Sequence, residues 1–203
     1  KTIYGGAFMK FRGYVQVYTG DGKGKTTAAI GLAIRALGAG KRVCFLQFMK
    51  NKSYSEHCIL NNLSRNLTVK TFGKPFFIAK KEEFDRLKEE VIGEEIVVFK
   101  SGFPPQEYVT LIHEGMEVAK QAVQSGDYDI VILDEVIVAV YFELIAGSEL
   151  DFLIQNKLDS VELILTGRKA SKELIEKADL VTEMKEIKHY YTNGIEARVG
   201  IEN

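Results

Sequence analysis

The sequence has no apolar run long enough to span a membrane, no excess of either charge and only two cysteines. The first absence argues against a transmembrane protein. A net charge of -1 argues against a general attraction to nucleic acid or to anionic membranes. Two cysteines, Cys44 and Cys58, cannot form a disulfide framework. Since no signal peptide is recognisable either, we expect a cytoplasmic protein without nucleic-acid or membrane partners.

What the sequence does contain is an alternation of apolar, strand-like runs and helical segments. The expected strands are Gly13–Tyr18, Arg42–Phe48, Leu67–Phe72, Ile130–Leu133, Val161–Leu165 and Leu180–Glu183. The expected helices are Lys25–Ala39, Lys80–Ile92, Gln106–Ser125, Ile137–Ala146 and Ser171–Ala178, the last capped by Ser171. Continuous apolar runs suit strands that are buried on both faces, and right-handed crossovers make the sheet parallel. The pattern predicts one three-layer α/β domain with a mostly parallel sheet.

A glycine-rich loop follows the first expected strand and opens the first expected helix. Strand, loop and helix in this order are the setting of a P-loop, whose backbone N–H groups attract phosphate oxygens. Lys25 would reach the phosphates, and the Thr26 hydroxyl would bind Mg²⁺. Thr19 replaces the first glycine of the usual pattern, and Lys23 adds a second cation. The alternative is a plain glycine turn. We predict a triphosphate site formed by Thr19, Gly20, Asp21, Gly22, Lys23, Gly24, Lys25, Thr26 and Thr27.

Two acids, Asp134 and Glu135, end a second buried strand at residues 130–133. This arrangement is similar to a Walker-B element, in which a carboxylate holds Mg²⁺ opposite the P-loop hydroxyl, here that of Thr26. A strand end with solvated acids is the alternative, but the P-loop favours the metal. Glu135 has a second interpretation, as the base of a hydrolytic reaction, and the sequence does not separate the two roles.

Two further segments have two interpretations each. Arg168 follows another buried strand and either contacts phosphate or lies in solvent. Phe76 belongs to an apolar cluster that is either core or a hydrophobic wall for a large flat ligand. Because parallel strands end at one edge of a sheet, the P-loop, Asp134 and Arg168 are expected around one crevice. The residues do not indicate an activated protein nucleophile, which leaves open that the attacking group comes with a substrate.

These segments together resemble the P-loop type of ATP:corrinoid adenosyltransferase, also called cob(I)alamin adenosyltransferase. The resemblance covers most of residues 13–202. It is carried by six motifs in order, TGDGKGKTTAA at 19–29, QF at 47–48, YDIVILDE at 128–135, TGR at 166–168, VTEM at 181–184 and GIE at 200–202. It implies a P-loop NTPase-like, RecA-like single domain at residues 13–203. Residues 1–12 precede it, with Met9 a candidate native start and residues 1–8 an added segment.

The resemblance implies that the 5′-deoxyadenosyl group of ATP is transferred to the cobalt of a reduced corrinoid and that triphosphate is released, in adenosylcobalamin biosynthesis or salvage. Co(I) is itself the nucleophile, so the protein positions the reactants and neutralises the leaving triphosphate. Lys25, Thr26 and Glu135 would be catalytic. Thr26 and Glu135 would bind Mg²⁺ with Asp134 in support, and Arg168 would bind ATP. A homodimer and a flavoprotein reductant are also implied.

Phe76 falls where the family has a phenylalanine that helps to displace the lower ligand of the corrinoid. The surrounding residues depart from the family, because Pro75 precedes Phe76 and Ile78 takes the place of a tryptophan. The region around 80–105 looks like an insertion. Two other functions stay open. One is a RecA-like P-loop ATPase with Glu135 as base and Arg168 as sensor, and the other is a binding module switched by ATP.

Overall fold

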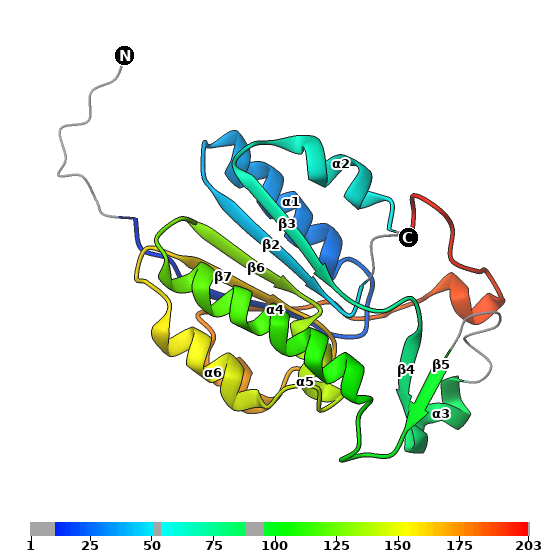
Figure 1. Cartoon of the computed structure of the whole chain (residues 1–203). Helices are drawn as coiled ribbons and strands as arrows, with labels where there is room; N and C mark the ends of the chain where they lie inside the picture. Colours follow the sequence, from blue (N-terminus) through cyan, green and yellow to red (C-terminus); the bar gives the residue numbers. More distant parts are fainter. Residues whose placement is uncertain (1–10, 51–53, 88–95, 203) are drawn as a thin grey trace, which may run out of the picture.

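The computed structural model describes residues 11–50, 54–87 and 96–202. Its centre is a six-stranded sheet in the order β3-β2-β6-β7-β1-β8, and all strand pairs in it are parallel (Figure 1). The strands are β1 (Val15–Thr19), β2 (Val43–Phe48), β3 (Leu67–Phe72), β6 (Ile130–Asp134), β7 (Glu162–Thr166) and β8 (Leu180–Glu183). They coincide with the six expected strands to within two residues at each end.

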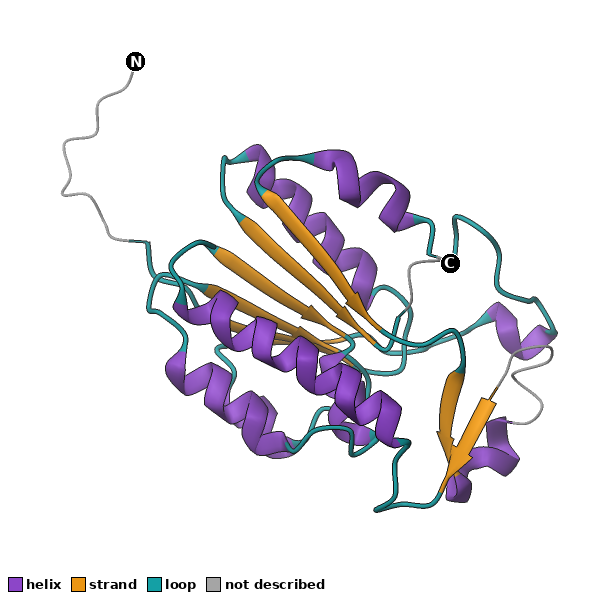
Figure 2. Cartoon of the chain, in the orientation of Figure 1, coloured by secondary structure: helices purple, strands orange, loops and turns teal. Residues whose placement is uncertain are grey.

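Helices cover both faces of this sheet (Figure 2). On one face, α1 (Lys25–Gly38) packs on β2, β6 and β7 through the fully buried Ala29 and Ala33. On the other face, α4 (Gln106–Gln124), α5 (Val136–Tyr141) and α6 (Gly147–Asn156) enclose the larger apolar cluster. Helix α2 (Glu56–Leu63) packs against the edge strand β3. The prediction of a three-layer, mostly parallel α/β domain is confirmed.

A small second sheet lies beside the main one. It consists of β4 (Phe77–Lys80) and β5 (Ile96–Phe99), which pair in parallel, with α3 (Lys81–Leu87) between them in the chain. Ile78 and Phe99 are buried and tie this unit to the larger core cluster. The expected helix Lys80–Ile92 is present as α3 as far as residue 87, and its remainder lies outside the described residues. Residues 1–10 of the expected N-terminal segment lie outside them as well.

The expected helix Ile137–Ala146 is wrong in its second half. Helix α5 ends at Tyr141, and Glu143 has a φ of 61°, which breaks the helical backbone before α6 begins at Gly147. Helix α6 and the 3₁₀ turn Tyr190–Asn193 were not predicted. Helix α7 (Lys172–Lys177) begins as expected, because the Ser171 hydroxyl accepts the Leu174 N–H at 3.2 Å. Among the described helices, none has the length and apolar character needed to cross a bilayer.

Candidate active site

The carboxyl ends of β1, β6 and β7 bring the three predicted motifs to one edge of the sheet. Strand β7 lies between the other two, so Thr166 at its end stands between the P-loop and Asp134. A cavity of about 720 Å³ opens at this edge. The residues that line it include Asp21, Gly22, Lys23, Gly24, Lys25, Thr26, Thr27, Lys50, Glu135, Arg168, His189, Gly200, Ile201 and Glu202. The expected crevice is therefore present, with Thr19 and Gly20 outside its described lining.

Two backbone hydrogen bonds join the P-loop to Met184, the residue after β8. The Gly22 N–H donates to the Met184 carbonyl at 2.7 Å, and the Met184 N–H donates to the Thr19 carbonyl at 2.8 Å. A Cβ on Gly20 would lie 2.4 Å from the Met184 carbonyl oxygen, and one on Gly22 would lie 2.7 Å from it. Both contacts are closer than real Cβ atoms allow, so these two glycines let β8 approach the loop.

The two lysines of the loop are already bound to acceptors of the protein itself. The Lys25 ammonium donates to the carbonyls of Gly20 and Gly22 at 2.7 and 2.8 Å, and burial lowers its pKa. The Lys23 ammonium donates to the Ile201 carbonyl at 2.6 Å and to the Glu202 carboxylate at 2.8 Å. The chain's last described residues therefore close over the loop and cover one of its cations.

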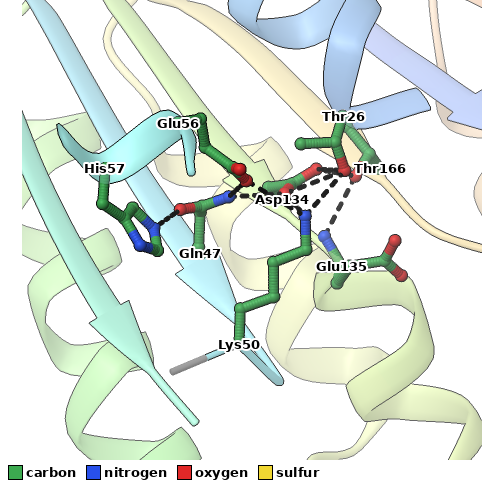
Figure 3. A network of polar contacts seen from close by, with 8 residues as sticks. All are labelled: Thr26, Gln47, Lys50, Glu56, His57, Asp134, Glu135 and Thr166. Atoms are coloured by element: carbon green, nitrogen blue, oxygen red, sulfur yellow. Dashed lines mark hydrogen bonds and ion pairs between the residues drawn. The ribbon is translucent and has the colours of Figure 1, made fainter. Parts of the chain in front are cut away.

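Asp134 is the centre of a polar network under the cavity (Figure 3). Its side chain is fully buried. The carboxylate accepts hydrogen bonds from Thr166 at 2.7 Å, Thr26 at 3.0 Å, the Gln47 amide at 3.1 Å and the Lys50 ammonium at 3.2 Å. Four donors hold this carboxylate in one orientation, so it can present a fixed oxygen pair beside the P-loop hydroxyl.

Glu135 lies next to this network, on the cavity wall. It is in the left-handed region with a φ of 60°, and its N–H donates to the Thr166 hydroxyl at 2.9 Å. Burial, with the neighbouring Asp134 carboxylate as the second cause, raises the pKa of Glu135. Asp134 is thus in hydrogen-bond contact with Thr26. The resemblance implied that Thr26 and Glu135 bind Mg²⁺ with Asp134 in support, and that assignment stays a prediction.

The comparisons with known proteins decide the family. The model described as ATP:corrinoid adenosyltransferase BtuR/CobO/CobP matches residues 11–203. The chain belongs to this family. It is 30% identical to the corrinoid adenosyltransferase of Escherichia coli (strain K12) over 196 residues, which cover 94% of this chain and 86% of that protein. It is 32% identical to the corrinoid adenosyltransferase of a Sinorhizobium species over 203 residues, which cover 94% of this chain and 80% of that protein.

Membership in the ATP:corrinoid adenosyltransferase family confirms the prediction drawn from the order of the motifs, and with it the prediction of a transferase. Among solved structures, the genome packaging NTPase B204 from Sulfolobus turreted icosahedral virus 2 in complex with ATP-gammaS aligns at 19% identity with a TM-score of 0.41. That alignment covers 84% of this chain and 73% of that one. A likeness of this size carries no argument about the function of this adenosyltransferase family member.

Phe76, the residue predicted to contact the corrinoid, lies outside the described lining of this cavity. Phe76 is half-buried and packs edge-on against Tyr108 of α4, with ring centroids 5.6 Å apart at 82°. It is not among the described residues that line the P-loop cavity. Ile78, in the family's tryptophan position, is buried in the core, while Phe77 is 44% exposed. The apolar cluster is therefore part core and part surface.

Sequence reasoning assigned no role to Gln47, Lys50, His57, Thr166 or Glu202. Gln47 is fully buried in β2; its amide N–H donates to Asp134, and its carbonyl oxygen is paired with His57 Nε2. A polar side chain within the apolar strand VCFLQF was a signal that could have been read, because a buried amide needs partners. Glu202 is far along the chain from the loop, and its local sequence does not indicate the contact.

Proposed function

We propose that this chain transfers the 5′-deoxyadenosyl group of ATP to the cobalt of a reduced corrinoid, cob(I)alamin or a related one, with release of triphosphate. The main support is that Lys23, Lys25 and Arg168 lie around one cavity, beside the part-buried Thr26–Asp134 pair. A site with several cations is what a leaving group with several negative charges requires.

In the proposed reaction, Co(I) attacks the ribose C5′, the Co–C bond forms and the C5′–O bond breaks. The electron pair of that bond leaves with the triphosphate. Lys25 and Lys23 would exchange their present acceptors for phosphate oxygens, and Arg168 would add a bidentate contact. Asp21 lines the same cavity and would lie near the ribose. The nucleophile belongs to the substrate, so the residues bind and align the reactants.

The Thr26–Asp134 pair fits a magnesium ion. Its oxygens lie 3.0 Å apart, and the contact of the Lys50 ammonium with both residues supports a cation at this position. Within the described part of the chain no group of three or more His, Cys, Asp or Glu side chains is arranged to hold a metal. Mg²⁺ usually takes one or two protein ligands and completes its shell with phosphates and water. When bound, Mg²⁺ would neutralise triphosphate charge; Thr26 and Asp134 would hold it, with Glu135 alongside.

The other features implied by the resemblance stay proposals. They are the role of Phe76 in displacing the lower corrinoid ligand, the homodimer, the flavoprotein reductant, the cytoplasmic location and the insertion around 80–105. A RecA-like ATPase is the second candidate, because Glu135 lines the cavity and its raised pKa suits a base. The ATPase would release phosphate and ADP, and a nucleotide switch would bind ATP with little turnover.

A single-turnover experiment tests the proposal. The protein is mixed with Mg²⁺-ATP and chemically reduced cob(I)alamin without oxygen, the corrinoid spectrum is followed, and the phosphate product is identified. Adenosylcobalamin together with inorganic triphosphate is the expected result. If ADP and phosphate form and the corrinoid stays unchanged, the transferase proposal is wrong and the ATPase is the better interpretation.

A further inference from the structure

The backbone of Lys50 has a fixed position between the cavity and the polar network around Asp134. It follows β2, and Met49 before it has a left-handed φ of 61°, which turns the chain at the end of the strand. The backbone of Gly73 lies directly against that of Lys50, so that a Cβ on Gly73 would come within 2.4 Å of the Lys50 carbonyl carbon. The stem of this lysine therefore starts from a fixed point beside the cavity.

The Lys50 ammonium lies against the oxygens that the proposed function assigns to the metal (Figure 3). It is 3.1 Å from the Thr26 hydroxyl, 3.2 Å from an Asp134 carboxylate oxygen and 3.7 Å from a Glu56 carboxylate oxygen. Its side chain is only 13% exposed. Burial alone would lower the pKa of Lys50, but the carboxylates of Asp134, Glu135 and Glu56 outweigh it and raise this pKa. The three acceptor distances, and not this shift, define the position of the ammonium.

A magnesium ion and this ammonium cannot occupy the same place. Mg²⁺ binds oxygen at about 2.0–2.1 Å, so an ion bound to Thr26 and Asp134 on the side where the Lys50 ammonium contacts both would overlap that amine. Two cations at such a separation repel each other strongly where water is scarce. A flexible four-carbon stem lets the ammonium move into the adjoining cavity, where the triphosphate would lie.

We propose that Lys50 is a tethered cation that holds the place of the metal between Thr26 and Asp134 and is displaced onto the phosphates when metal and nucleotide enter together. This proposal rests on the proposed metal-dependent function. It gives the nucleotide-free protein a low affinity for divalent cations alone. It also makes Lys50 a positioning residue for the triphosphate, because the displaced ammonium remains within reach of the cavity that it now borders.

The test measures metal binding without nucleotide or corrinoid. Mn²⁺ is the probe, and its free concentration is followed by electron paramagnetic resonance. Lys50→Met should bind Mn²⁺ at least about tenfold more tightly than the unchanged protein, because the competing charge is gone. Lys50→Arg keeps the charge and should bind as weakly as the unchanged protein. Lys50→Gln, which keeps a hydrogen-bond donor, replaces the methionine variant if that variant does not fold.

A matched control separates displacement from a mere change of net charge. Lys23→Met removes a cation from the same cavity, but one bound to Glu202 rather than to Asp134, and it should leave the Mn²⁺ affinity unchanged. The proposal is overturned if Lys50→Met and Lys50→Gln bind Mn²⁺ no more tightly than the unchanged protein, or if Lys23→Met tightens binding equally. Adenosyl transfer is assayed separately, so its failure would refute the proposed function without deciding the metal result.

Discussion

Alanine substitutions in the P-loop test what its glycines are for. A Cβ on Gly22 would lie 2.7 Å from the Met184 carbonyl oxygen and 2.8 Å from the Lys185 carbonyl carbon. The φ of Gly22 is not left-handed, so Gly22→Ala adds a clash with backbone atoms but no torsional strain. Gly24 is the opposite case. Its φ is 120°, and the nearest atom to an added Cβ is the flexible Met184 Sδ at 3.4 Å.

The expected losses follow from these two effects. Overpacking costs about 1–3 kcal/mol, and a left-handed backbone costs an alanine about 1–2 kcal/mol. Gly20 combines both, because its φ is 94° and an added Cβ would lie 2.4 Å from the Met184 carbonyl oxygen. Gly20→Ala should therefore lower the free energy of unfolding by about 2–5 kcal/mol, more than Gly22→Ala or Gly24→Ala. Gly31→Ala is the control. A Cβ there meets nothing within 4 Å in helix α1, so it should gain about 0.5–1 kcal/mol.

Urea unfolding followed by circular dichroism measures these differences, and thermal unfolding checks them. In a chain of this size each 1 kcal/mol shifts the Tm by about 2–4 °C. ATP binding to the folded variants is measured in parallel by calorimetry. If Gly22→Ala is as stable as the unchanged protein while its ATP affinity falls, Gly22 is needed for phosphate binding and not for the contact with Met184. The reasoning from the Met184 contact would then be wrong.

Three further predictions concern the cavity and the corrinoid. Lys25→Ala should lower the rate of adenosyl transfer by about 10²–10³-fold, because the leaving triphosphate loses a cation; near-normal single-turnover rates would exclude the loop as the site. Glu202→Gln should tighten the binding of inorganic triphosphate severalfold, because Lys23 loses its ionic partner, and calorimetry showing unchanged affinity would contradict this. Phe76→Ala should slow reactions that start from Co(II) more than those supplied with Co(I); an equal loss in both assays would remove its role in ligand displacement.

The central strands β2, β6 and β7 could be predicted because each is a short, nearly continuous apolar run, and burial on both faces requires such runs. Helix ends were harder to predict where the backbone leaves the helical region at a residue other than glycine or proline. Glu143 does this after α5, with a φ of 61°, and glutamate carries no local signal for that conformation. Helix α2 was missed because only His57 and Leu60 are buried, too few for a clear periodic stripe.

For the site, the sequence predicts the residues that belong to one motif, but it does not predict contacts between residues of different motifs. The P-loop, the two acids and Arg168 were predicted from local patterns, and the structure brings residues 21–27 of the loop, Glu135 and Arg168 around one cavity, with Asp134 buried beside Thr26. Which acid faces Thr26 is seen only in the fold: Asp134, the last residue of β6, bonds to the loop hydroxyl, and the chain turns with a left-handed φ at Glu135 directly after it. The pairing of Lys23 with Glu202 spans 179 residues, and only the folded chain shows it.

Three cations of the cavity are bound to the protein's own acceptors, Lys25 to loop carbonyls, Lys23 to Glu202 and Lys50 to Asp134. Triphosphate would therefore bind by exchange of partners, and its affinity is the difference between two sets of charge-assisted hydrogen bonds. Such an exchange weakens ground-state binding, but it gives each lysine an acceptor to return to when the product leaves. A transferase whose product is the whole triphosphate needs this return, because a loop that bound it with otherwise unpaired cations would release it slowly. Tighter triphosphate binding in Glu202→Gln, together with slower product release, is the combination that this reasoning requires.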